Sequence, residues 1–270
     1  MGTWYRSLGL PIEPVQLIML VGLVLGRSVP TLFLTPFLGG KAVPGNVKVG
    51  ISLALTVLLL PLLLQIEGTV PGGAAYGFLM AKEVAVGITL GFLASLVFHA
   101  FSSAGRLADV QRGSNMGETF VYQMGAQTSY LGQFYFQAAI VIFLILNGHH
   151  VFLRGYMRSF EVLPVWSFPE LSAGVGPAID QMARLSADLF VIAVQLSAPV
   201  VIAVFLTDVG FGIINRASPQ INVFMLSFPL KMFLGILMLL FALRLLADQF
   251  GVRAGEMIVA FYRMILFLGR

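Results

Sequence analysis

Charged side chains inside apolar stretches are the residues of this sequence best suited to take part in chemistry, such as proton transfer or ion pairing. Arg27, the adjacent Lys82 and Glu83, and Lys231 each stand within a run of uncharged, mostly apolar residues. A charge buried in such surroundings is unfavourable and therefore needs a partner. Because neighbouring residues on a helix point in different directions, we expect Lys82 and Glu83 to find separate partners, in this chain or in another.

Two functions fit Glu83. A proton-coupled small-molecule secondary transporter would use it as the titrating carboxylate, with Lys82 completing the coupling site, whereas a structural ion pair would hold packed helices or subunits together. Carriers commonly contain internal repeats with corresponding broken helices, and the sequence shows no convincing repeat. We therefore prefer the ion pair and keep the transporter as the alternative.

Enzymatic chemistry has few candidate residues. His149 and His150 form the only close histidine pair, and adjacent side chains on a helix chelate a metal poorly. The sequence contains no HExxH, no phosphate-binding loop of the Walker type, no GxSxG and no cysteine. It therefore predicts a protein that is not an enzyme, with no catalytic residues, no metal site and no cofactor.

The composition is that of a membrane protein. Of 270 residues, 58% are hydrophobic and 10% are charged, whereas about a quarter of the residues of a soluble domain are charged. The net charge of +4 comes from basic residues scattered along the chain, and a nucleic-acid-binding protein would gather them on one face. We expect a single all-α membrane domain over 1–270, with no nucleic-acid partner.

Apolar runs recur along the whole chain, separated by short segments rich in glycine, proline or charge. They cover 15–38 (interrupted at Arg27, Pro30 and Pro36), 49–66, 74–104, 131–153, 189–206, 220–246 and 256–268. The loops predicted between them are 39–48, 67–73, 105–130, 154–188 and 207–219. Prolines inside or beside these runs predict kinked helices.

Three glycine pairs have the GxxxG spacing that lets helix backbones approach closely. They are Gly22/Gly26, Gly87/Gly91 and Gly251/Gly255. Such spacings also arise by chance in a chain with 29 glycines. Close packing and chance are balanced for the first two pairs, and chance is favoured for the third.

The segment 105–130 is the longest polar stretch between two apolar runs, and it is rich in glycine. Irregular backbone at membrane depth must be surrounded by protein or water. The segment could line or plug a pore, or it could be a plain surface loop, and the residue pattern does not separate the two. Further along, Pro219, Gln220 and Asn222 predict a turn that starts a helical hairpin.

Several segments together resemble one family of proteins. They are Arg27 with Pro30, PFLGGKAVPGNVKVG (36–50), Lys82–Glu83, AGRLADVQRG (104–113), NGHH (147–150), SFEVLP (159–164) and NRASPQINVFMLSFPLK (215–231). The last is the most specific and contains Arg216, Pro219, Gln220, Asn222, Phe224, Pro229 and Lys231. In this order, over 15–265, the chain resembles the FliR/SctT family, the export-gate subunit of the flagellar and type III protein secretion apparatus.

The resemblance implies a structural and gating subunit built of kinked helical hairpins. Its part at about 15–184 would be FliP-like and its part at 185–268 FliQ-like. One copy would complete a right-handed helical export gate with five FliP/SctR-like and four FliQ/SctS-like subunits, beside a FlhB/SctU-like switch protein. The gate would pass unfolded proteins across the bacterial inner membrane, in a flagellar basal body or an injectisome.

The resemblance also assigns a pore segment. The loop after AGRLADVQRG forms a plug in the closed channel of this family, which would place Gly113, Met116, Gly117, Phe120 and Met124 in the pore. Methionine supplies adaptable apolar packing, and glycine lets a loop rearrange, so both suit a seal that must open and close.

Overall fold

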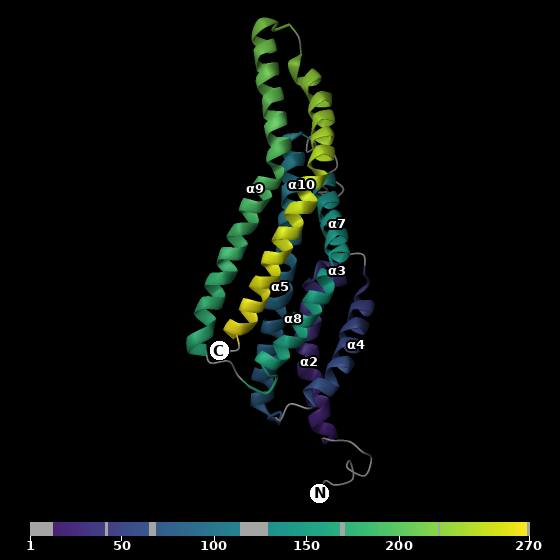
Figure 1. Ribbon diagram of the computed structural model, residues 1–270, viewed down its shortest axis with the longest axis vertical. Helices are drawn as coiled ribbons and strands as arrows, with labels where there is room; N and C mark the ends of the chain where they lie inside the picture. The colour runs from purple at the N-terminus through teal and green to yellow at the C-terminus, as the bar shows by residue number, and fades with distance from the viewer. Residues whose placement is uncertain are drawn as a thin grey trace. The chain divides into compact units, whose positions relative to one another are not determined.

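The computed structural model describes residues 13–40, 43–64, 69–113, 129–167, 171–220 and 222–268. Within these ranges every regular element is a helix (Figure 1). The helices are α2 (Pro14–Leu34), α3 (Pro36–Gly39), α4 (Gly45–Leu63), α5 (Ala74–Gln111), α7 (Tyr130–Ile145), α8 (Gly148–Val162), α9 (Leu171–Ala217) and α10 (Val223–Leu268). Among the described residues, five helices are long and apolar enough to cross a membrane, or six if α7 and α8 form one bent span. The prediction of an all-α membrane protein is confirmed.

Several predicted interruptions are wrong, because polar residues end an apolar run without ending a helix. Arg27 and Pro30 lie inside α2, and the predicted loop at 207–219 is helical as far as Ala217. Most of the predicted loop at 154–188 is also helical, since α8 continues to Val162 and α9 begins at Leu171. The two last apolar runs are a single helix, α10.

Amphipathic packing explains why α8 continues through its charged residues. Its buried residues are Gly148, Phe152, Gly155, Tyr156, Ser159 and Phe160. Their spacing of three and four places them on one face, so the charged residues between them occupy the other. The charged residues of this segment therefore mark the polar face of α8 and not its end.

The true break in the predicted run at 131–153 lies between α7 and α8. The two helices are bent by 76°, and Asn147 between them has a φ of 56°. Asparagine is one of the few residues other than glycine that adopt this left-handed conformation readily. The bend therefore has a local cause in the sequence.

The chain divides into two compact units. The first comprises 1–95, 147–183 and 256–270, and the second 96–146 and 184–255. In the first unit α2 packs against α4 (Figure 1). It also contacts α8, through a hydrogen bond between the hydroxyls of Ser28 and Tyr156 at 2.6 Å. The predicted division into a FliP-like part at about 15–184 and a FliQ-like part at 185–268 is a separate division, based on resemblance, and stays a prediction.

Glycine pairs bring α2 and α5 together in the first unit. A Cβ on Gly87 would lie 3.1 Å from Cα of Arg27, and one on Gly91 would lie 3.0 Å from Cα of Thr31. Gly22 and Gly26 of α2 face the side chains of Tyr76 and Met80 in the same way. Close packing is confirmed for these two pairs. At the third pair, a Cβ on Gly255 would meet nothing described within 4 Å.

Aromatic side chains form the core of the second unit. Phe250 of α10 lies with its ring centroid 5.7 Å from Phe98 and 5.0 Å from Phe101 of α5. Phe143 of α7 joins them at 5.3 Å from Phe98. In the same unit α9 and α10 run antiparallel, joined by an ion pair between Asp208 and Lys231 and a hydrogen bond between Gln195 and Arg253.

Candidate functional site

A buried ion cluster holds the first unit together. Arg27 of α2 is fully buried, as is Glu83 of α5. The guanidinium binds the carboxylate through two atoms, with Nη2 2.9 Å from Oε1 and Nε 2.5 Å from Oε2. Bidentate pairs of this kind are among the strongest hydrogen-bonded contacts in proteins. Arg27 is thus the partner of Glu83.

Arg27 also reaches the end of α8. Nη1 donates to the carbonyl of Ser159 at 2.8 Å, and Nη2 donates to the carbonyl of Leu163 at 2.8 Å. The ring of Phe160 lies 4.2 Å from the guanidinium carbon, a cation–π contact. One side chain therefore ties together α2, α5 and the last turn of α8.

Lys82 completes this Arg27 cluster, defined as Arg27, Lys82 and Glu83. Its Nζ lies 2.6 Å from Oε1 of Glu83, and it donates to the carbonyls of Pro164 and Ser167 at 2.9 Å each. Lys82 and Glu83 each have a separate partner, as expected, in these carbonyls and in Arg27, and the two residues also pair with each other. A lysine side chain is long and flexible enough to turn its ammonium group toward the next residue, although the two Cβ atoms diverge.

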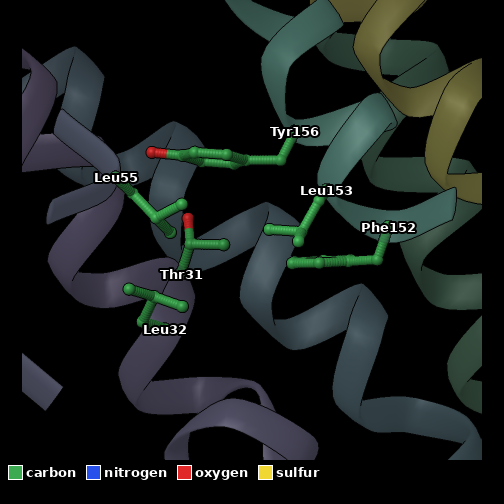
Figure 2. A pocket seen from close by; sticks show the side chains of 6 residues that line it. All are labelled: Thr31, Leu32, Leu55, Phe152, Leu153 and Tyr156. Carbon is green, nitrogen blue, oxygen red and sulfur yellow. The ribbon is translucent and has the colours of Figure 1, made fainter. Parts of the chain in front are cut away.

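A small apolar seam borders the cluster, lined by Thr31, Leu32, Leu55, Phe152, Leu153 and Tyr156. Figure 2 shows these side chains facing one another from α2, α4 and α8. The hydroxyl of Tyr156 is already bonded to Ser28, and that of Thr31 donates to the carbonyl of Gly87 at 3.0 Å. The seam therefore provides helix packing, with its polar groups satisfied.

A second cluster lies in the other unit, where the segment 114–128 leaves α5 and enters α7. We name Asp109, Arg112, Ser129 and Leu131 the loop base. One carboxylate oxygen of Asp109, Oδ2, accepts from the hydroxyl of Ser129 at 2.7 Å and from the backbone N–H of Leu131 at 2.8 Å. Arg112 lies 3.4 Å from the other oxygen. The buried Asp109 thus fastens the start of α7 to the end of α5.

The pore residues Met116, Gly117, Phe120 and Met124 lie outside the described residues. Gly113 is described and has a φ of 75°, a conformation that glycine adopts without strain. It borders Phe228 of α10, since a Cβ at this position would lie 3.4 Å from the ring. Of the predicted pore segment, the structure therefore shows the first residue and its contact with α10.

The residues of the 215–231 string occupy the α9–α10 connection. Arg216 is exposed in the last turn of α9, and Pro219 and Gln220 form a turn. Asn222 directly precedes α10, and its side-chain oxygen accepts from the N–H of Met225 at 3.3 Å. This is the geometry of a helix N-cap.

The other predicted residues of the string lie inside α10. Phe224 is 59% exposed, and Pro229 lies within the helix without ending it. Lys231 pairs with Asp208 of α9, and the side chain of Asp208 is half exposed. Lys231 therefore has the partner expected for a charge inside an apolar run.

Asp109 and Arg112 are the site residues that sequence reasoning missed, although both lie in the segment AGRLADVQRG (104–113). Their spacing of three residues is a signal for a contact on one helix face. The bonds from Asp109 to Ser129 and Leu131 had no such signal, because they cross a segment of more than a dozen residues.

The rings of His149 and His150 lie at the start of α8 with their centroids 4.1 Å apart and their planes tilted by 38°. Among the residues that the structure describes, no group of three or more His, Cys, Asp or Glu side chains is arranged to hold a metal ion. Within the described part of the chain, the Arg27 cluster and the loop base are therefore the groups of buried charged residues that we consider as functional sites.

Comparison with known proteins gives one consistent result. Residues 18–257 match the family model of bacterial export proteins, family 1. The chain is similar to the flagellar biosynthetic protein FliR of Bacillus subtilis, at 34% identity over 76% of this chain and 78% of the relative. It is also similar to the secretion system apparatus protein SsaT of Salmonella typhimurium, at 33% over 71% and 73%. The surface presentation of antigens protein SpaR of Shigella sonnei is 30% identical, over 87% and 86%.

Proposed function

Because the chain belongs to the family of bacterial export proteins, family 1, we propose that it is a structural and gating subunit of a type III protein export channel. Its relatives bear the names of a flagellar biosynthetic protein and of secretion apparatus proteins. These names support export of proteins and not transport of small molecules. The exported material would be unfolded protein, and the chain's own role would be to build and close the passage.

The pairing of Glu83 is the observation that carries this proposal within the structure. A coupling carboxylate must meet substrate or solvent to exchange its proton. Glu83 is fully buried and held by Arg27 and Lys82. Because both of its oxygens are bound by these two cations, the carboxylate serves as a structural anchor between helices.

Exposed apolar helix faces support a role within a larger assembly. The most apolar window of α5 is 67% buried inside the chain, whereas those of α4 and α10 are 22% buried and that of α9 is 33% buried. Lipid or partner subunits must cover these faces. The proposed partners are FliP/SctR-like subunits, in five copies, FliQ/SctS-like subunits, in four copies, and a FlhB/SctU-like switch protein. The proposed location is the bacterial inner membrane.

The loop base supports the gating part of the proposal. A segment that seals a channel must be held at both ends while its middle rearranges. Asp109 joins the residues that flank 114–128 on either side. The proposed seal consists of Gly113, Met116, Gly117, Phe120 and Met124, with methionine and phenylalanine supplying apolar contacts.

Two experiments test this function. Co-expression with FliP-like and FliQ-like subunits, followed by native mass spectrometry, should give a stable complex with one copy of this chain. Deletion of 116–124 should then raise the ion conductance of the purified complex while leaving its subunit composition unchanged, because the closed state alone loses contacts. A chain that purifies only as a monomer, or a deletion complex as tight as the parent, would contradict the proposal.

A further inference from the structure

The end of α5 rests on one face of α10. Gly113 borders the ring of Phe228, and Nη2 of Arg112 lies 3.4 Å from the sulfur of Met232. The third contact is Gly235, against the stem of Arg112. Phe228, Met232 and Gly235 are spaced by four and three residues, so they form a single stripe along the helix. The end of α5 is therefore seated on α10.

Gly235 makes room for Arg112. A Cβ at this position would lie 2.6 Å from both Cγ and Nε of Arg112, closer than real Cβ contacts. The Arg112 side chain is only 8% exposed, so it cannot move into solvent without leaving Asp109. Nε of Arg112 has no hydrogen-bond partner among the described residues. Arg112 thus fits against α10 because residue 235 is glycine and has no Cβ.

Arg112 also connects two sets of contacts. On one side it faces Asp109, which binds Ser129 and Leu131 at the start of α7. On the other side it lies against Met232 and Gly235 of α10. A displacement of α10 would therefore move Arg112 and strain the bonds that position both ends of the loop.

We propose that Arg112 is a positioning residue, seated in a slot that Gly235 forms, through which α10 sets the closed position of the loop base. This inference rests on the proposed function, because it assigns the consequence to the tightness of the export channel. It adds a specific coupling to that function: a partner subunit that displaces α10 would change the position of the seal through Arg112.

The test is a double-mutant cycle measured as ion conductance. Gly235→Ala and Arg112→Ala should each raise the K⁺ and Cl⁻ conductance of the purified complex in planar bilayers several-fold, with unchanged subunit composition. The double variant should conduct no more than Arg112→Ala alone, because alanine at 235 acts by displacing Arg112. Gly255→Ala is the matched control on the same helix, where a Cβ meets nothing described within 4 Å. It should leave the conductance unchanged.

Each outcome decides. Additive increases, or a Gly235→Ala complex as tight as the parent, would overturn the proposal. If Gly235→Ala fails to assemble, the double variant should restore assembly, and its failure to do so would also overturn it. The deletion of 116–124 separates the two levels of inference. A leaky deletion beside tight point variants refutes only the role of Arg112, and a tight deletion refutes the proposed seal together with this inference.

Discussion

Neutralising Glu83 should destabilise the protein more than neutralising Lys82, its neighbour in the Arg27 cluster. Glu83→Gln keeps the shape of the side chain but leaves Arg27 and Lys82 buried without an anion. Removing one partner of a buried ion pair costs about 3–5 kcal/mol. Since about 1.4 kcal/mol corresponds to a tenfold change in an equilibrium constant, the unfolding equilibrium should shift by roughly two to four powers of ten.

Lys82→Met gives the matched comparison within the same cluster. It leaves the balanced pair of Arg27 and Glu83 intact and removes the donor to the carbonyls of Pro164 and Ser167. Leaving buried acceptors without a donor costs about 1–3 kcal/mol. The structure therefore predicts the order of severity as Glu83→Gln above Lys82→Met.

Equilibrium unfolding in mixed detergent micelles, followed by tryptophan fluorescence, measures both variants. Trp166 lies in the turn whose carbonyls bind Lys82, so its emission reports on the cluster. Asp208→Asn is the control, because its pair with Lys231 is half exposed on the acid side and such pairs contribute at most about 1 kcal/mol. A Glu83→Gln protein as stable as the parent, or one more stable than Lys82→Met, would refute the reasoning.

Three further predictions concern packing, capping and the exposed ion pair. Gly87→Ala should lower recovery of the folded chain, since its Cβ would press on the backbone of Arg27, whereas Gly77→Ala, in open space on the same helix, should be neutral or stabilising by up to about 1 kcal/mol. Asn222→Ala should destabilise the chain by about 1 kcal/mol through loss of the α10 N-cap, seen as a lower midpoint of thermal unfolding. Lys231→Met should change stability by less than about 1 kcal/mol in the same assay.

Much of the architecture could be predicted because it depends on local properties of the chain. Apolar content identified membrane helices, since burial in lipid requires long uncharged runs. Charges inside those runs identified Arg27, Lys82 and Glu83, because a buried charge needs a partner wherever that partner lies. The 215–231 string identified the family, and the family model then matched 18–257.

Helix ends were harder, because hydropathy reports surroundings and not backbone conformation. The charged residues of α8 and α9 divided apolar runs without dividing helices. Conversely, the bend at Asn147 falls inside an apolar run and depends on the φ of one residue. A polar residue is compatible with a helix whenever it can face away from the core.

The tertiary structure alone decided which buried charges meet. Arg27 and Glu83 are 56 residues apart, and Arg27 and Ser159 are 132 residues apart. The meeting of Asp109 with Leu131, and of Arg112 with Gly235, depends equally on how α5, α7 and α10 pack. The sequence determined that these groups had to be satisfied, because an unpaired charge in an apolar interior is unfavourable. The partners followed from helix packing, in which glycines set how closely two backbones approach and side-chain length sets which groups can reach.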